Sequence, residues 1–261
     1  MREIDSQPSE HLIPDLLIDA ISDCIPKIGT DEFIGQFLDI VRLIGAGQTT
    51  AYAYELAKVK CLLSSNFMSD DKGGTLAATY LDGWFREDPL YEQSMDMVIN
   101  ECFVEQLDDL LPSMNPLYRA IFFDAPGFKT KVAVLVAQGS LRMVLNLYFA
   151  DDISDNAAHS RGRVTAGMYR LIGRASATHF LRLEMPDFPL PLTVLSERER
   201  QVCIGMLAGK KAEIIADEIG VGSSSVVTYR HRAYQKLGIS SRGQLFSICR
   251  SWTGTGASSA A

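Results

Sequence analysis

The stretch GSSSVVTYRHRAYQKLG, residues 222–238, contains the residue types best suited to contact a nucleic acid. It carries Arg230, His231, Arg232 and Lys236 and no acidic residue. Guanidinium and ammonium groups bind phosphate oxygens, and short polar side chains can approach base edges closely. A solvated helix face would account for such a charge run equally simply. The distribution of these residues around the helix therefore has to discriminate between the two interpretations.

An α-helix over 223–237, at about 100° per residue, sorts these side chains onto two sides. The outward side collects mostly short polar residues, flanked by Arg230 and Arg232: Ser224, Val227, Thr228, His231 and Gln235. The opposite side collects residues that can pack on neighbouring helices: Val226, Tyr229, Ala233 and Leu237. A helix that enters the major groove needs this arrangement. We predict that Ser224, Val227, Thr228 and His231 belong to the DNA-binding surface, with Val227, Thr228 and His231 facing base edges.

Basic residues around this helix are the candidates for phosphate contacts: Lys210, Lys211, Arg230, Arg232, Lys236 and Arg242. Each loss of one such contact should lower the salt dependence of binding by about one unit of slope. For any single one of them, a solvated surface charge is the alternative reading.

The residues in front of this helix predict the elements that position it. Ser196 and Glu199 have the spacing of a capping box, and Gly209 ends the helix that they begin. A second helix is expected over 210–219, where the small Ala216 permits close crossing and Gly220 permits a turn with positive φ. This is the pattern of a helix-turn-helix.

Taken together, LSERERQV, EIIADEIGV, SVVTYRHRAYQKLGI and SRGQL resemble the LuxR/GerE-type helix-turn-helix domain of bacterial transcription regulators. The resemblance covers about residues 193–250. It implies a four-helix unit that binds DNA as a homodimer, in which the third helix reads bases and a fourth, over 241–250, contributes to dimer contacts. Gly222, Val227 and Tyr229 depart from the family's usual residues. A valine can pack against a thymine methyl group, so the departure changes the expected sequence preference only.

Charge and composition divide the chain at a proline-rich segment. From Thr193 onward there are nine basic and five acidic residues, whereas the whole chain has a net charge of −7. PDFPLPL, residues 186–192, disfavours a helix and predicts an extended linker. We therefore expect a ligand-sensing and dimerisation domain over 1–185, a linker over 186–192 and a DNA-binding domain over 193–261.

The front domain is predicted to be α+β. Helical patterns over 12–21 and 33–44 precede two extended runs, TTAYAYEL and VKCLL. Thr30 is expected to be the N-cap of the second of these helices. Another helix is expected over 90–110, a β-hairpin over 131–149 with its turn at 138–140, and a long helix over 156–183. This order favours an α/β sensor sandwich, similar to PAS, GAF or autoinducer-binding domains, followed by the all-α four-helix domain.

The sequence YLDGWFREDPLY, residues 80–91, is similar to the aromatic and Asp-Pro signature of the autoinducer-binding domain, although Trp84 and Asp88 are closer together than is usual there. The predicted ligand-binding residues are Tyr80, Trp84, Asp88, Tyr91, Phe122, Phe123, Met143 and Tyr148. Asp88 would accept a hydrogen bond from a ligand. Alternatively, most of these residues form an ordinary core, and Asp88-Pro89 begins a helix.

Other classes of function find little support. The four histidines have no metal-ligand spacing, the chain has no GxSxG or Walker motif, and Gly45-Ala46-Gly47 follows a helical stripe and not a strand. No apolar run reaches about 18 residues, and five scattered cysteines suggest reduced thiols in a cytoplasmic protein. We therefore expect no enzyme activity, no cofactor, no metal and no membrane partner.

The resulting hypothesis is a regulator that binds double-stranded DNA as a homodimer and responds to a small-molecule effector. One alternative is an interaction module that has lost operator binding and heterodimerises with another regulator. Another is an enzyme in the front domain, which would need a polar cleft with strongly shifted pKa values.

Overall fold

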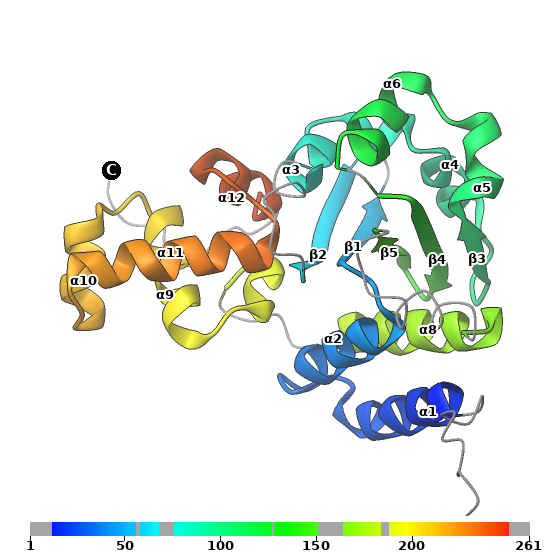
Figure 1. Cartoon of the computed structure of the whole chain (residues 1–261), viewed down its shortest axis with the longest axis horizontal. Coiled ribbons are helices and arrows are strands. Elements are labelled where there is room, and N and C mark those ends of the chain that lie inside the picture. The colour runs from blue at the N-terminus through cyan, green and yellow to red at the C-terminus, as the bar shows by residue number, and fades with distance from the viewer. Residues whose placement is uncertain are drawn as a thin grey trace, which may run out of the picture.

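The structure is a computed structural model that describes residues 12–55, 58–67, 76–126, 128–150, 164–183 and 188–250. A sheet flanked by helices forms its N-terminal part, and a bundle of helices forms its C-terminal part (Figure 1). The mixed α+β fold class and the all-α unit at the C-terminal end are confirmed.

Five antiparallel strands form one sheet in the order β2-β1-β5-β4-β3. Their bounds are β1 Gln48–Glu55, β2 Lys58–Asn66, β3 Cys102–Gln106, β4 Thr130–Gln138 and β5 Leu141–Phe149. The predicted hairpin over 131–149 is confirmed, because β4 pairs with β5 along its whole length around a turn at Gly139, whose φ is 54°. The two extended runs TTAYAYEL and VKCLL are confirmed as β1 and β2.

Helices cover both faces of the sheet (Figure 1). One face carries α1 (Leu12–Cys24), α2 (Phe33–Ile44) and α8 (Ala166–Arg182). The other face carries short helices, namely α3 Leu76–Leu81, η3 Trp84–Glu87, α4 Pro89–Asp96, α5 Leu107–Leu110, α6 Pro116–Arg119 and the π-helical turn η5 Ala120–Asp124. Strands β4 and β5 are consequently largely buried on both faces, as their runs of valine, leucine and alanine require. The edge strand β3 is less covered, and Phe103 on it is exposed.

The approach of α8 to the sheet is closest at Gly173. A Cβ atom at this position would lie 2.4 Å from Cγ1 of Val134 on β4. Real carbon atoms do not pack at that distance, so the glycine is what allows α8 to lie directly against the strand.

Three local predictions in the front domain were wrong. Residues 90–110 do not form one helix, because Cys102–Gln106 pairs with β4 as the edge strand β3. Thr30 does not cap α2, which begins at Phe33 after Glu32; the Thr30 hydroxyl instead donates to the carbonyl of Lys27. The long helix predicted over 156–183 begins at Ala166 with Thr165 as its cap, and the predicted part before 164 lies outside the described residues.

Four helices form the C-terminal unit: α9 Glu197–Leu207, α10 Ala212–Ile219, α11 Ser223–Leu237 and α12 Arg242–Ile248. The predicted capping box of Ser196 and Glu199 is present at the start of α9. Gly220, with φ 67°, ends α10 in the left-handed conformation and begins the turn to α11. The bounds predicted for α11 are confirmed exactly as residues 223–237.

The segment between the two parts is not simply extended. Residues 184–187 lie outside the described residues, but Leu190–Val194 forms a 3-10 helix, η6, that packs against β2 and buries Leu192 completely. Pro191 takes an early helical position, where its missing N–H is not needed. The segment thereby covers the free edge of the sheet.

The helical unit also contacts the sheet domain directly. The Ser64 hydroxyl on β2 donates to the carbonyl of Leu237 at the C-terminal end of α11, at 2.8 Å. The Ser247 hydroxyl on α12 donates to the carbonyl of Ala78 on α3, at 3.3 Å. One continuous core of buried side chains runs through both parts. The two parts are therefore docked in this arrangement.

All five cysteines are free and buried. Burial raises the pKa of the Cys61 and Cys203 thiols to about 12. These side chains accordingly behave as small apolar core residues.

His179 on α8 is completely buried and joins α8 to the turn before α2. Its Nδ1 accepts a hydrogen bond of 3.1 Å from the Gly29 N–H, and its ring stacks on Phe33 with centroids 4.2 Å apart. Because Nδ1 is the acceptor, the proton of the neutral ring is on Nε2. Burial lowers the pKa of His179 from 6.5 to about 4, with Asp31 opposing the change.

We expect the free energy of unfolding to fall as the pH drops from 6.5 to about 4, because only the unfolded chain then protonates His179. The loss attributable to this residue should approach about 1.4 kcal/mol per pH unit within that window. His179→Phe, which keeps the stacking on Phe33, should remove this component. Urea unfolding of both proteins at several pH values measures it; parallel curves for the two proteins would contradict the assignment.

Candidate functional site

One side of α11 is buried and the other is exposed, as the helical wheel predicts. Val226, Ala233 and Leu237 are buried, and they pack the helix against its neighbours α9 and α10. The outward residues are exposed to solvent: Ser224, Val227, Thr228, Arg230, His231 and Arg232. Val227 retains 47% of its surface. The apolar side is thus fixed by the fold, and the polar side with its arginines is free.

Six of the ten predicted DNA-binding residues line one groove of about 610 Å³ between α10, α11 and the start of α12: Lys210, Lys211, Val227, Arg230, His231 and Arg242. Glu213 is the one acidic residue in the lining of that groove. The groove therefore has a cationic character that suits phosphate. The other four residues, Ser224, Thr228, Arg232 and Lys236, lie outside its lining.

Lys236 makes a specific contact inside the domain. Its ammonium group lies 2.7 Å from Oε2 of Glu199, whose side chain is only 5% exposed. Burial opposes ionisation of Glu199, yet hydrogen bonds from Lys236 and Ser196 outweigh it and lower the pKa of that carboxyl from 4.5. This ion pair joins the C-terminal half of α11 to the first turn of α9.

Two further cations are also engaged. The Lys210 ammonium group lies 2.7 Å from Oε2 of Glu218, and the Arg242 guanidinium donates to the carbonyl of Met206 at 2.9 Å. Lys211 is exposed at the N-cap of α10, so both lysines precede that helix, whereas the sequence suggested that it starts at Lys210. Arg230 and Arg232 are exposed, and neither guanidinium group has a hydrogen bond or ion pair among the residues that the structure describes.

In the front domain, Asp88 is the centre of a buried hydrogen-bond network. The hydroxyls of Tyr80 and Tyr118 both donate to Oδ2 of Asp88 at 2.9 Å, and the Leu90 N–H donates to Oδ1 at 2.9 Å. Because Tyr80 gives its proton to Asp88, it accepts from the Tyr54 hydroxyl. Asp88 is also the N-cap of α4, followed by Pro89 at the first helical position. The reading of Asp88-Pro89 as a helix start is confirmed. Asp88 is also a buried acceptor, but its donors here belong to the protein, so its role toward a ligand stays a prediction.

Burial, assisted by the Asp88 carboxylate, raises the pKa of Tyr80 and Tyr118 well above 10. Their hydroxyls consequently remain protonated donors at neutral pH. The surrounding rings pack on one another, with centroids 4.6 Å apart for Tyr52 with Tyr80 and for Tyr118 with Phe122. We call this group, Tyr54, Tyr80, Asp88, Tyr118 and the rings around them, the aromatic compartment.

Lys131 on β4 is a buried cation at the edge of the aromatic compartment. Only 1% of its surface is exposed, and its Nζ lies 5.7 Å from the ring centroids of both Phe123 and Tyr148. Burial lowers the pKa of Lys131, and the Asp88 carboxylate opposes that change. An ammonium group in such surroundings is costly unless it has a partner, so Lys131 marks the part of the compartment that is best suited to hold a polar group of a ligand.

The predicted ligand-binding residues do not all share one side of the sheet. Tyr80, Asp88 and Phe123 are buried in the core on the α3–α6 face, as is Phe122. Trp84, Tyr91 and Tyr148 are half-buried and pack against the same core. Met143 lies in the core on the α2–α8 face. Its assignment to a common pocket was wrong because Met143 and Tyr148 are five residues apart on one strand, and odd spacings place side chains on opposite faces.

Sequence reasoning missed three residues of the compartment. Tyr54 alternates with Tyr52 along β1, and this spacing of two was a usable signal for a shared face. Tyr118 is 30 residues from Asp88, and no local pattern connects the two. Lys131 is placed by its position in β4 beside Ala133 and Leu135, so a charged residue within an apolar strand was the available signal.

Among the residues that the structure describes, no cluster of His, Cys, Asp or Glu has the composition of a metal site. Within the same ranges, no helix is long and apolar enough to cross a membrane.

Comparisons with known sequences match the C-terminal part of the chain. A family model described as bacterial regulatory proteins, luxR family (GerE), matches residues 193–249. The response regulator GacA of Pseudomonas protegens is 38% identical over 60 residues, which are 23% of this chain and 28% of that protein. An HTH-type transcriptional regulator in the exeN 3'region of Aeromonas salmonicida is 41% identical over 54 residues, 21% of this chain and 28% of the relative. The match thus spans just over a quarter of each relative's length.

Two solved structures are similar at 12% sequence identity. The VqsR LBD domain from Pseudomonas aeruginosa has a TM-score of 0.46, and the alignment covers 65% of this chain and 99% of the VqsR chain. SdiA in complex with octanoyl-rac-glycerol has a TM-score of 0.40, and the alignment covers 95% of this chain and 97% of the SdiA chain. The family match over 193–249 and the four helices α9–α12 agree with one another. Residues 193–249 of this chain are therefore a domain of the luxR family of bacterial regulatory proteins.

Proposed function

We propose that the chain is a sequence-specific DNA-binding transcription regulator whose front domain senses a small molecule. The observation that carries the proposal is the orientation of α11: its apolar side is buried, whereas Val227, Thr228 and His231 are exposed beside two free guanidinium groups. A helix of this kind fits the major groove, with short side chains at base edges and arginines at the phosphate walls.

The roles of the residues follow from their surroundings. Val227, Thr228 and His231 face bases, while Arg230, Arg232 and Lys211 contact phosphates. Thr228 already donates its hydroxyl to the carbonyl of Ser224 at 3.1 Å, which leaves its oxygen lone pairs and its methyl group to face the DNA. Lys236 belongs to the fold through Glu199. Two copies of the domain would present two such helices to successive major grooves of a palindromic site, about one helical turn apart.

The sensor role rests on the aromatic compartment. Rings with few polar groups among them are the usual lining of small-molecule sites. The Asp88 network supplies fixed hydrogen-bonding groups, and Lys131 supplies a buried cation that a ligand carbonyl or carboxylate would satisfy. Because the rings pack on one another, a ligand has to displace some of them. Occupancy can act on DNA binding only through a different affinity for the two arrangements.

The alternative, a module that has lost operator binding and heterodimerises with another regulator, is less well supported. Such a module would not need to keep a row of exposed short polar side chains beside free arginines on α11. The family match over residues 193–249 is to bacterial regulatory proteins and lends no support to a front-domain enzyme.

The DNA-binding role predicts a loss of phosphate contacts in Arg230→Gln and Arg232→Gln. Each substitution should weaken retention of genomic DNA fragments for all sequences and lower the slope of log K against log[salt] by about 0.9. Gel-shift titrations of the full chain at several salt concentrations measure both quantities.

Arg170→Gln is the matched control, because Arg170 is an exposed arginine on α8 in the front domain. It removes the same charge and should leave the slope unchanged. The heterodimerising module would be favoured if the Arg230 and Arg232 variants retained DNA as well as the natural chain. It would also be favoured if the chain captured a tight protein partner and retained no DNA.

Lys236→Gln should act on stability and not on the salt slope. The change leaves the nearly buried Glu199 carboxylate without its cation, at a cost of about 1–2 kcal/mol near neutral pH. Since the pKa of Glu199 is depressed in the folded chain, this stabilisation exists above pH 4.5 and disappears as the pH falls through the lowered value. Urea unfolding near pH 7 and near pH 3 checks this. A variant of normal stability with a reduced slope would instead assign Lys236 to phosphate.

Lys131→Met should stabilise the ligand-free chain, because it replaces a buried ammonium group by an apolar side chain of similar length. In the natural chain, the lowered pKa of Lys131 means that the free energy of unfolding rises with pH between that lowered value and about 10. The variant should lack this rise.

Native mass spectrometry of both proteins from their own host tests the ligand role of Lys131. A small molecule retained by the natural chain should be lost from the Lys131→Met variant, and equal retention would contradict that role.

A further inference from the structure

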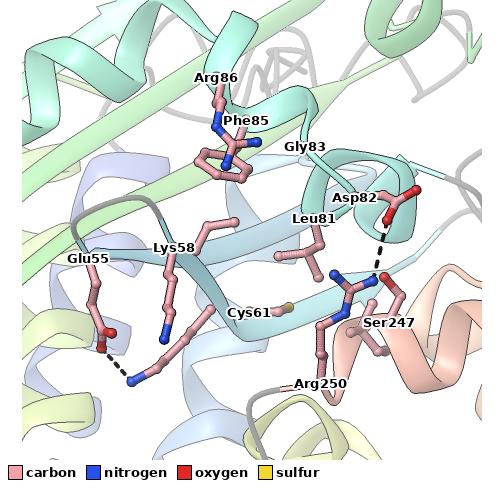
Figure 2. A pocket seen from close by; sticks show the side chains of 13 residues that line it. Glu55, Lys58, Cys61, Leu81, Asp82, Gly83, Phe85, Arg86, Ser247 and Arg250 are labelled. Carbon is pink, nitrogen blue, oxygen red and sulfur yellow. Dashed lines mark hydrogen bonds and ion pairs between the residues drawn. The ribbon is translucent and has the colours of Figure 1, made fainter.

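A second groove lies at the junction of the two parts of the chain. Its volume is about 560 Å³, within the range of small-molecule sites. Three elements line it: the hairpin of β1 and β2, the segment of α3 and η3, and the C-terminal end of α12. Figure 2 shows Phe85 and Arg86 on one side, Lys58 and Cys61 along the strand, and Ser247 and Arg250 reaching in from α12. It is separate from the aromatic compartment and from the groove along α11.

The charges around this groove are unequal. Two of its four cations are neutralised, since Lys60 is paired with Glu55 and Arg250 lies 3.4 Å from Asp82. Lys58 and Arg86 have no carboxylate partner within the described parts of the chain. Arg86 is held over the Phe85 ring at 4.6 Å, which fixes its guanidinium group at the rim. The groove therefore offers two positive charges to an occupant.

The remaining lining is largely apolar. Leu81 and Phe85 from the front domain, Val59 and Cys61 on β2 and Ile248 from α12 all line the groove. Val59 is half-buried, and the other four are largely buried. An apolar floor between two unpaired cations favours an amphipathic anion over a hydrophilic anion such as inorganic phosphate, because only the former gains from both features. A carboxylate beside either Arg86 or Lys58 would leave its hydrocarbon part against Val59, Leu81 and Phe85.

We infer that this groove is a regulatory site for a small organic carboxylate with an apolar body. An occupant touches the front domain and α12 at once, next to the two contacts that dock them, from Ser247 to Ala78 and from Arg250 to Asp82. It therefore binds the docked arrangement more tightly than any separated one and shifts the population toward docking. The effect on DNA rests on the proposed function, because α11 is joined to the same junction through Ser64 and Leu237.

Binding is tested on the full chain by isothermal titration calorimetry with 4-phenylbutyrate and its uncharged amide, 4-phenylbutanamide. The carboxylate should bind at least about ten-fold more tightly than the amide, since only the carboxylate forms an ion pair with Lys58 or Arg86. The double variant Lys58→Gln/Arg86→Gln should lose at least about ten-fold in affinity for the carboxylate. Arg170→Gln, which removes an arginine from α8 on the opposite face of the sheet, should bind like the natural chain.

Equal affinities for acid and amide, an undiminished affinity in the double variant, or no binding of the acid at millimolar concentration would each overturn the site. Thermal unfolding of the double variant without ligand verifies that it is folded, and both substituted residues are exposed. The regulatory part is tested by gel shift with and without 4-phenylbutyrate. A change in DNA affinity in the natural chain that is absent from the double variant supports it, and an unchanged affinity overturns it. A chain that binds the acid but no DNA would refute the proposed function and leave the site intact.

Discussion

The exposed face of α11 is fixed because three apolar side chains on the opposite face are buried. Val226, Ala233 and Leu237 are 3% exposed or less, so rotating the helix about its axis would bring apolar surface into water. At about 25 cal/mol for each Å² of apolar surface, three such side chains hold the orientation firmly. Glu199 adds a directional contact through Lys236. The side chains on the outward face can therefore be small and polar, since they contribute nothing to the packing of the domain.

The same helix is joined to the front domain by a hydrogen bond. Its last carbonyl, at Leu237, would lack an intrahelical donor, and Ser64 on the edge strand β2 supplies one. The 3-10 helix η6 packs on β2 as well, and α12 packs on α3. An edge strand is normally a risk for aggregation, and here the helical domain covers it. One set of contacts thus protects the sheet and fixes the position of α11 relative to the front domain.

Two buried polar groups distinguish the aromatic compartment from an ordinary core. Asp88 is fully hydrogen-bonded, by two tyrosine hydroxyls and one backbone N–H, and this satisfies a charge that would otherwise be very costly. Lys131 instead has two aromatic rings beside it. A network with every member satisfied gives a rigid and specific structure, whereas a cation stabilised only by ring faces and a distant carboxylate keeps an unused capacity to bind. This asymmetry is the physical basis for assigning ligand recognition to the Lys131 side.

Local patterns were sufficient where one helix or hairpin decides the outcome. The capping box at Ser196, the left-handed turn at Gly220, the bounds of α11 and the hairpin around Gly139 all follow from residue types within a few positions. Apolar periodicity gave the buried and exposed sides of α11 for the same reason. Tertiary structure decided the features that depend on distant partners. Cys102–Gln106 is a strand because β4 offers it a free edge, and Met143 lies apart from Tyr148 because the faces of β5 are covered by different helices. Tyr118 reaches Asp88, Ser64 reaches Leu237, and Lys236 reaches Glu199 across separations that no period of 2 or 3.6 encodes, because only packing brings such residues together.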